Sequence, residues 1–222
     1  MSKNIAIDGP AGAGKSTIAK KLAKDLGFIY VDTGAMYRTL ALYFIRKGIS
    51  SDDTEAIEGV LPDINVELSY IDGAQHVLLN GEDVSDAIRQ EEVGNMASSV
   101  STYPFVREKL LSLQRDMAEK NDVVMDGRDI GTTILPNADV KIFLTASVMT
   151  RAERRCKELI EKGQDADLDS IARDIKERDE RDMNREISPL VQAEDAVLVD
   201  SSEMTIDQVV SEIKNIAQEK GV

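Results

Sequence analysis

The residues with the clearest chemical signature form a glycine-rich stretch near the N-terminus, residues 9–16 (GPAGAGKS). The stretch fits the pattern G-x-x-x-x-G-K-[ST], in which glycines let backbone N–H groups surround a phosphate that a Cβ would obstruct. In this pattern the lysine, here Lys15, reaches the β- and γ-phosphates of a nucleoside triphosphate, and the hydroxyl of Ser16 binds Mg²⁺. The stretch therefore predicts a site for a triphosphate and its metal ion.

The elements on either side of this stretch agree with that interpretation. Residues 4–8 (NIAID) form a short apolar run, which is typical of a buried parallel strand. Residues 16–26 then place Ile18, Leu22 and Leu26 four apart, which predicts a helix that Gly27 ends. The N-terminus of such a helix directs its partial positive charge toward the same phosphates.

The charge distribution points to a second anion site. The net charge is −14, which argues against nucleic acid or an anionic membrane as a partner. All 13 arginines nevertheless lie between Arg38 and Arg185. Because arginine binds phosphate and carboxylate with two parallel hydrogen bonds, this distribution favours a local anion-binding cavity. Arginines on solvated helix faces are the alternative.

The composition is that of a soluble globular protein. The chain has 222 residues, 42% of them hydrophobic, which is enough for a core. The single cysteine, Cys156, excludes an internal disulfide, and no apolar run approaches the ~20 residues of a membrane span. The first strand begins within eight residues and leaves no room for a signal peptide. We expect a cytoplasmic protein.

Further strands and helices alternate along the chain and predict an α/β fold. Residues 28–32, 122–126, 140–144 and 196–200 read as four more apolar strands, which gives a five-stranded parallel sheet with the first. Helices are expected over residues 33–47, 91–101, 105–119, 150–162, 168–184 and 205–218.

Residues 65–84 break this alternation. Val66, Leu68 and Tyr70 alternate with polar residues, and turns at residues 72–73 (DG) and 80–81 (NG) connect the run to two further short strands. We interpret the segment as an inserted antiparallel subdomain, about residues 62–97. His76, the only histidine, lies on it without a neighbour in sequence that could orient it, and we expect a surface residue.

Polar residues with a chemical role are expected where strands end and helices begin. Thr33 is placed to cap the helix that follows residues 28–32, and Arg38, in an early turn of that helix, is a candidate phosphate ligand. Residues 122–126 end in Asp126, which resembles the carboxylate that supports Mg²⁺ beside a phosphate loop, and GRDIG follows at residues 127–131.

The last two candidate groups lie on helices. Arg151, Arg154 and Arg155 are three and four residues apart and share a helix face, where anions or Glu158 could neutralise them. In the helix over residues 168–184, an apolar stripe of Leu168, Ile171 and Ile175 continues as Arg178, Asp182 and Arg185. Such a change from apolar to charged is expected at a cleft rather than in a core.

Together, four segments closely resemble the bacterial-type cytidylate kinases: the phosphate loop, residues 32–38 (DTGAMYR), residues 126–132 (DGRDIGT) and residues 176–185 (KERDERDMNR). The resemblance runs from Asn4 to the final helix. It implies a single kinase domain over residues 1–222 with a P-loop three-layer α/β/α core, an inserted subdomain that binds the monophosphate, and a lid at about residues 151–166. The implied reaction transfers the γ-phosphoryl group of ATP, with Mg²⁺, to CMP or dCMP.

The resemblance also implies roles for individual residues. Ser98, Arg107 and Asp129 read the cytosine ring, Arg178 and Asp182 hold the sugar, and Arg38, Arg128 and Arg185 bind the acceptor phosphate, with Thr33 and Tyr37 beside them. Catalysis falls to Lys15, Arg128, Arg185 and the lid arginines Arg151, Arg154 and Arg155. The ATP site comprises Gly9, Pro10, Ala11, Gly12, Ala13, Gly14, Lys15, Ser16 and Thr17, with Mg²⁺ on Ser16 and Asp126 as a further candidate ligand.

Other functions stay open at this stage. The nearest alternative is a kinase for another acceptor such as UMP, AMP or a nucleoside. A regulatory GTPase is disfavoured because no N-K-x-D guanine-reading motif is present. A nucleotide-binding module without activity is a third alternative. The partners expected are small molecules, and a monomer is expected.

Overall fold

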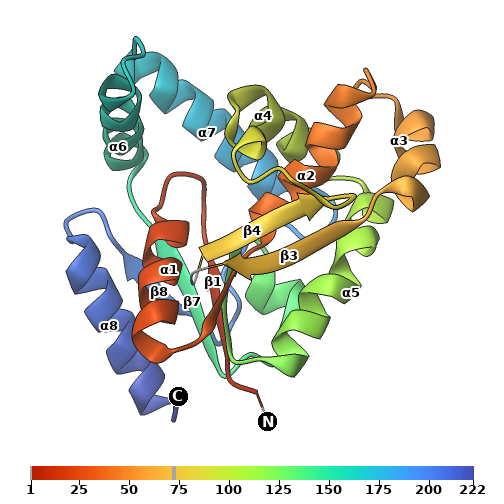
Figure 1. The fold of residues 1–222 in the computed structure, drawn as a ribbon. Coiled ribbons are helices and arrows are strands. Elements are labelled where there is room, and N and C mark those ends of the chain that lie inside the picture. Colours follow the sequence, from red (N-terminus) through yellow and green to blue (C-terminus); the bar gives the residue numbers. More distant parts are fainter. Residues whose placement is uncertain (1, 72–73) are drawn as a thin grey trace. The chain divides into compact units, whose positions relative to one another are not determined.

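The computed structural model describes residues 2–71 and 74–222, and these residues form two compact units. The first unit comprises residues up to Tyr30 together with Ala118–Val222, and the second comprises Val31–Met117. Figure 1 shows the chain coloured along the sequence, with helices and strands labelled. No helix within the described ranges has the length and apolar character needed to cross a membrane.

A five-stranded parallel sheet forms the centre of the first unit. Its order is β2 (Ile29–Asp32), β6 (Val123–Gly127), β1 (Asn4–Asp8), β7 (Val140–Thr145) and β8 (Val197–Asp200). In the register, Asp8 lies opposite Gly127 on one side and Phe143 on the other. The carboxyl ends of β1 and β6 therefore meet at one edge, which is where parallel sheets bind ligands.

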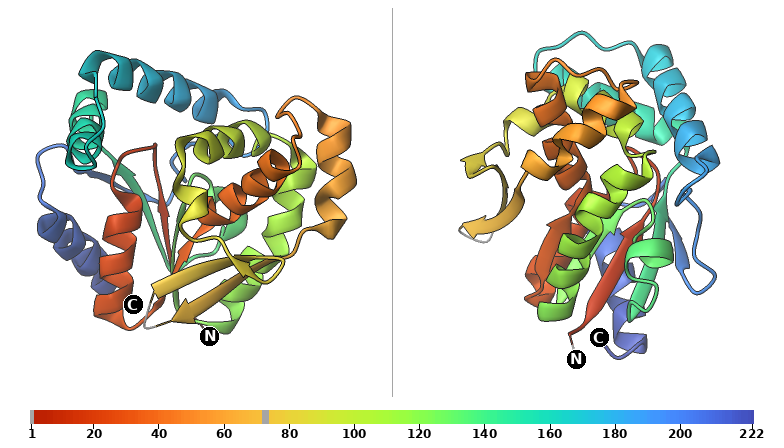
Figure 2. Two further views of the ribbon diagram at one scale, coloured as in Figure 1. Left: turned by 45° about the horizontal axis from the view of Figure 1, so that its top comes forward. Right: turned by 90° about the vertical axis from the view of Figure 1, so that its right-hand side faces the viewer.

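Two helices of the first unit bury their apolar faces on this sheet. α1 (Lys15–Leu26) contributes Ile18 and Leu22, and α8 (Ile206–Glu219) contributes Val210 and Ile213 to the same hydrophobic core as the strands. The two helices also contact each other and lie next to each other in the left view of Figure 2. Thr205 begins α8 with a capping box, because its side chain and that of Gln208 each accept a hydrogen bond from the other's backbone N–H.

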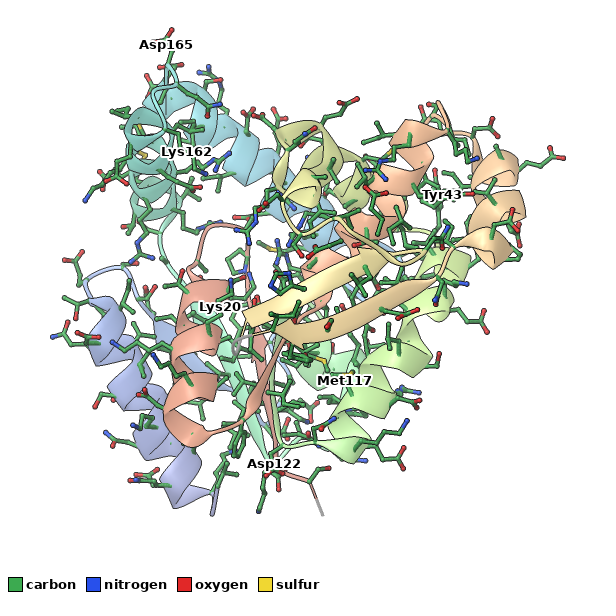
Figure 3. All side chains as sticks on the ribbon, in the orientation of Figure 1. Lys20, Tyr43, Met117, Asp122, Lys162 and Asp165 are labelled. Atoms are coloured by element: carbon green, nitrogen blue, oxygen red, sulfur yellow. The ribbon has the colours of Figure 1, made fainter. Side chains whose placement is uncertain are left out.

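The rest of the first unit consists of a short π-turn and a pair of helices. The turn, η3 (Ile130–Ile134), follows β6 after Arg128 and Asp129, and α6 (Val148–Glu161) and α7 (Leu168–Asn184) pack against each other. Ser147 and Asp167 cap the two helices through their side-chain oxygens. Figure 3 labels Lys162 and Asp165 at the exposed connection between them.

The second unit joins helices to a three-stranded antiparallel sheet. Its sheet has the order β3 (Val66–Ile71), β4 (Ala74–Leu79) and β5 (Glu82–Asp83), with Ser69 opposite His76. The turn before β5 has Asn80 and Gly81 at positive φ, as a two-residue hairpin requires. Its other elements are α2 (Thr33–Arg46), α3 (Thr54–Val60), η1 (Leu61–Asp63), η2 (Ala87–Arg89), α4 (Glu91–Val100) and α5 (Pro104–Lys120).

The structure confirms the predicted fold class, because the five parallel strands and the separate antiparallel sheet are both present. The predicted cap of α2 was wrong: Asp32, not Thr33, accepts the hydrogen bond from Ala35 N–H, at 2.8 Å. A carboxylate is a stronger hydrogen-bond acceptor than a hydroxyl at a helix N-terminus. Its negative charge also interacts favourably with the helix dipole there. The predicted turn at residues 72–73 lies outside the described residues. The sequence prediction did not include α3, which buries only Ile57.

Candidate active site

The phosphate loop connects β1 to α1, and its glycines take conformations closed to other residues. Gly9 has φ +151°, and a Cβ on it would lie 1.9 Å from the carbonyl oxygen of Leu144 on β7. Gly14 has φ +86° in the left-handed region and begins α1. The loop therefore leaves the sheet in close contact with the neighbouring strand and turns sharply into the helix.

Lys15 is buried within this loop and is held by the loop itself. Its Nζ donates a 2.7 Å hydrogen bond to the carbonyl oxygen of Pro10. Burial, with a smaller effect from the nearby charge of Arg128, lowers the pKa of Lys15 to about 7, against the opposing charges of Asp126, Asp182 and Asp8. A bound polyphosphate would add negative charge and favour the protonated amine.

Ser16 and Asp126 form the part of the site suited to a metal ion. The hydroxyl of Ser16 lies 3.1 Å from Oδ2 of Asp126, and the hydroxyl of Tyr30 donates to Oδ1 of the same carboxylate at 2.8 Å. Both Asp126 and Tyr30 are buried. Among the described residues, no group of three or more His, Cys, Asp and Glu side chains is arranged so that it could hold a metal ion. A hydroxyl and one carboxylate oxygen nevertheless suit Mg²⁺, which keeps several waters and takes few protein ligands.

The turn after β6 is anchored from β1. The two carboxylate oxygens of Asp8 accept the backbone N–H groups of Ile130 and Gly131, each at 2.7 Å. Burial raises the pKa of Asp8 to about 6, although these two hydrogen bonds and the charge of Lys15 act in the opposite direction. Arg128 and Asp129 lie between β6 and this turn, so the anchored turn limits where their side chains can lie.

Arg128 and Asp129 each pair with a residue at the end of α7 or just after it. Nε of Arg128 donates to Oδ2 of Asp182 at 2.9 Å, and Nη2 of Arg185 lies 3.4 Å from Oδ1 of Asp129. The last two side chains are each 5% exposed. We call these four residues the mixed-charge cluster. Its carboxylates neutralise its arginines, which lets buried charges of both signs coexist.

Arg178 lies one helical turn before Asp182 and adds to the field of the mixed-charge cluster. Burial alone would raise the pKa of Asp182. The hydrogen bond and charge of Arg128, with the charges of Arg178 and Arg185, instead hold that pKa below its usual value. Asp182 is therefore a carboxylate at neutral pH, surrounded by cations that could bind an anionic or polyhydroxylated ligand.

The three arginines of α6 point to different partners. Arg151 forms a bidentate pair with Asp179 of α7, at 3.0 and 2.6 Å, and also donates to the carbonyl oxygen of Ala11 in the phosphate loop at 3.0 Å. Arg154 donates to the carbonyl oxygen of Ser201 at 2.7 Å. Arg155 pairs with Glu158 on the surface, as the helical spacing predicted.

The second unit contains the other candidate residues. The carboxylate of Asp32 pairs with Arg38 at 3.0 Å. The backbone N–H of Asp32 donates a hydrogen bond to the side-chain oxygen of Gln75 at 2.9 Å. The guanidinium of Arg107 lies 5.7 Å from the ring centre of Tyr37, which is within cation–π range. Thr33 is buried at the start of α2, and Ser98 is half-buried on α4.

Comparison with known proteins decides the family. The sequence model of the family "Cytidylate kinase" matches residues 5–219. The chain belongs to the cytidylate kinase family. A cytidylate kinase from Ligilactobacillus salivarius is 53% identical over 216 residues, which cover 97% of this chain and 96% of the relative. One from Caldicellulosiruptor saccharolyticus is 51% identical over 210 residues, with 95% and 93% covered.

One solved structure supports the fold alone. An uncharacterized protein from Eubacterium ventriosum superposes with a TM-score of 0.55 at 16% identity, and the match covers 99% of each chain. Membership of the cytidylate kinase family rests on the sequence comparisons instead.

Within the first unit, the structure of this cytidylate kinase family member brings together Arg128, Asp129, Asp182 and Arg185, which the sequence analysis selected. The sequence analysis did not select Asp8, Tyr30 or Asp179. Asp179 could have been found, because residues 175, 179 and 182 share a helix face. Asp8 and Tyr30 carry no local pattern, since their partners lie about 120 and 96 residues away.

Proposed function

We propose that the chain transfers the γ-phosphoryl group of ATP to CMP or dCMP, which gives CDP or dCDP and ADP. The observation that carries the proposal is the mixed-charge cluster, which lies in the same unit as the phosphate loop of a cytidylate kinase family member. A phosphate loop alone supports only a triphosphate donor. The arginines and carboxylates of the cluster match an acceptor with a phosphate, a sugar and a base edge.

The donor half of the proposal rests on Lys15, Ser16 and Asp126. Lys15 exchanges the carbonyl oxygen of Pro10 for phosphate oxygens of ATP, which is a short movement because the loop already surrounds the amine. Ser16 and Asp126 are the residues that would hold Mg²⁺. When bound, Mg²⁺ neutralises charge that develops on the β- and γ-phosphate oxygens.

The acceptor half assigns one task to each group of residues. Arg38, Arg128 and Arg185 bind the acceptor phosphate, and Arg178 and Asp182 hold the sugar. Thr33 and Tyr37 support the acceptor beside Arg38. The acceptor phosphate replaces the carboxylates that pair with these arginines, so the exchange keeps the charge balanced.

The base edge is assigned to Ser98, Arg107 and Asp129. Cytosine presents a donor amino group at position 4 and acceptors at O2 and N3, which match a carboxylate and an arginine. Uracil presents an acceptor at position 4 and would face Asp129 with like polarity. An unpaired buried acceptor costs about 1–3 kcal/mol, so a preference of about five- to hundredfold for cytosine is expected.

The transfer needs no general base, because the attacking atom is a phosphate oxygen that is already ionised at neutral pH. Positioning and charge neutralisation then supply the catalysis. We assign the lid to about residues 151–166, with Arg154 and Arg155 as candidates to contact the transferring group and Arg151 as a candidate at its base. Exclusion of water prevents hydrolysis of the donor.

The proposal extends to the setting in which the protein works. A net charge of −14 fits small-molecule substrates rather than nucleic acid. We propose that the protein acts as a single domain and a monomer in the cytoplasm, with residues 62–97 as the inserted subdomain that binds the monophosphate.

The test is ADP release from MgATP with CMP, dCMP, UMP, AMP and GMP as parallel acceptors. CMP and dCMP should raise turnover far above the rate with water alone. If no monophosphate does so, the proposed function is wrong. If AMP or UMP exceeds CMP, the reaction class stands and the substrate assignment does not.

Asp129→Ala supplies the matched test of base reading. We expect it to lower the ratio of kcat/KM for CMP over UMP by about tenfold, because it removes the partner of the amino group. Asp25→Asn is the control, since Asp25 pairs with Lys214 on the surface at 3.3 Å. Equal loss on CMP and UMP would remove Asp129 from the base site.

A further inference from the structure

Asp8 is a buried carboxylate to which neither the phosphate-loop pattern nor the proposed mechanism gives a role. It is the last residue of β1 and directly precedes Gly9. Its side chain is turned toward the backbone of residues 130 and 131, at the start of η3. Two 2.7 Å hydrogen bonds to consecutive amides thus connect segments that are 122 and 123 residues apart.

The arrangement is costly, which argues that it does more than fill space. Asp8 is 5% exposed, and burial of a carboxylate without compensation is strongly unfavourable. At Gly131 the turn also lies very close to the side chains of Asp8 and Lys141. A Cβ on Gly131 would lie 3.3 Å from Oδ2 of Asp8 and 3.1 Å from Cδ of Lys141. A side chain at residue 131 would therefore require these neighbours to shift by a few tenths of an ångström.

The two amides belong to the residues that directly follow Asp129. On the other side of the turn, the carbonyl oxygen of Asp129 accepts hydrogen bonds from the N–H groups of Thr133 and Ile134, at 2.9 and 3.2 Å. The peptide groups on the carboxyl side of Asp129 are therefore fixed at both ends. The direction in which its side chain leaves the backbone follows from this constraint.

We propose that Asp8 is a positioning residue that fixes the turn after β6, and through it the orientation of Asp129, so that the carboxylate of Asp129 selects the acceptor base. The inference rests on the proposed function, because it assigns Asp129 to the base. It adds a residue that belongs to the strand of the donor loop yet determines preference among acceptors.

The Asp8→Asn variant separates this role from simple packing. An ionised carboxylate offers acceptor oxygens to both amides, whereas a carboxamide offers one oxygen and one NH₂ group. The substituted side chain has nearly the same volume, but its NH₂ group faces a backbone N–H. One of the two hydrogen bonds is lost, and the turn moves away from the side chain of residue 8 at that amide.

The control variant is Asp139→Asn. Oδ2 of Asp139 accepts the backbone N–H of Asn4 at 2.8 Å, at the opposite end of the same strand. Asp139→Asn therefore also removes a carboxylate that accepts a backbone N–H, but it leaves the turn after β6 untouched. Thermal unfolding of both variants measures their stability, so that a general loss of stability is recognised.

The experiment measures kcat/KM for CMP and for UMP, the KM for ATP, and the backbone amide NMR signals of Ile130 and Gly131. For Asp8→Asn we expect the CMP-to-UMP ratio to fall about tenfold, the KM for ATP to change about twofold or less, and at least one of the two amide signals to move upfield. Asp139→Asn should leave the ratio and both signals unchanged.

Three outcomes decide the matter. If the amide signals move and the CMP-to-UMP ratio does not, Asp8 is structural and the inference is overturned. If Asp8→Asn fails to fold, Gly131→Ala, which keeps the carboxylate and displaces the turn, must lower the ratio; an unchanged ratio overturns the inference. Wild-type protein that does not prefer CMP to UMP instead contradicts the proposed base assignment, which distinguishes the two failures.

Discussion

The buried pair of Arg151 and Asp179 gives the sharpest quantitative prediction. The two side chains are 4% and 6% exposed and share two hydrogen bonds of 3.0 and 2.6 Å. Removal of one member leaves the other as an uncompensated buried charge, which typically costs about 3–5 kcal/mol. We therefore expect Asp179→Leu alone to lower the free energy of unfolding by about this amount, or the thermal midpoint by about ten degrees.

The double variant tests the physical reason rather than the size of the effect. Arg151→Met with Asp179→Leu replaces both charges with apolar groups of similar volume, and such replacements are often nearly neutral. We expect the double variant to lie within about 2 kcal/mol of the wild type, whereas two single losses of about 3–5 kcal/mol each would sum to about 6–10 kcal/mol, so the two changes should be coupled by at least about 4 kcal/mol. Its loss of the hydrogen bond from Arg151 to the carbonyl oxygen of Ala11 should remain visible as a higher KM for ATP.

The assay is urea unfolding followed by circular dichroism for the two single variants and the double variant. Arg155 and Glu158 supply the matched comparison, because they form an ion pair with side chains 39% and 48% exposed. Removal of that pair should cost about 0.3–0.5 kcal/mol. A loss below about 1 kcal/mol in Asp179→Leu, or a double variant that equals the sum of the singles, would refute the reasoning.

Three further predictions concern the site. Lys15→Ala should remove phosphoryl transfer to every acceptor while leaving thermal unfolding nearly unchanged, and activity retained with any acceptor would contradict its role. Tyr30→Phe should weaken metal binding a few-fold, because it frees the carboxylate of Asp126; Mn²⁺ binding measured by electron paramagnetic resonance checks this, with Tyr43→Phe as the control. The pH dependence follows from Asp8, whose pKa of about 6 lies above the 3.8 of the free side chain. Between these values the native state binds the extra proton, so the contribution of this group to stability increases as pH falls, while the CMP-to-UMP ratio should decrease below pH 6. A ratio that stays constant in the wild type would contradict the prediction, and Asp8→Asn should show no such change.

Burial sets the direction of this pH effect, and the charges around Asp8 adjust its size. The neighbouring carboxylate of Asp129 raises its pKa further, and Lys15 lowers it. Lys141, which lies against the same turn, contributes its stem there and directs its ammonium group to Asp195 at 2.8 Å. Titration of the acceptor phosphate is common to CMP and UMP, so the ratio of their kcat/KM values isolates the protein group.

The local sequence predicted most of the elements and the glycine-rich loop between β1 and α1. Apolar runs of five residues predicted all five parallel strands, since a strand buried on both faces has no polar alternation. The glycine pattern of residues 9–16 predicted the loop, because its spacing is a requirement of the backbone itself. The helix end at Gly27 followed for the same reason, and Gly27 has positive φ.

Only the tertiary structure decided how the charged residues are paired. The sequence placed Arg151 with Arg154 and Arg155 on one helix face, but it could not show that Arg151 reaches Asp179 and Ala11, which lie 28 and 140 residues away. The same holds for Asp8 and the turn after β6, and for Tyr30 and Asp126. Periodicity reports which side of an element a residue occupies, whereas a buried charge is stabilised by whichever distant partner the packing brings within hydrogen-bond distance.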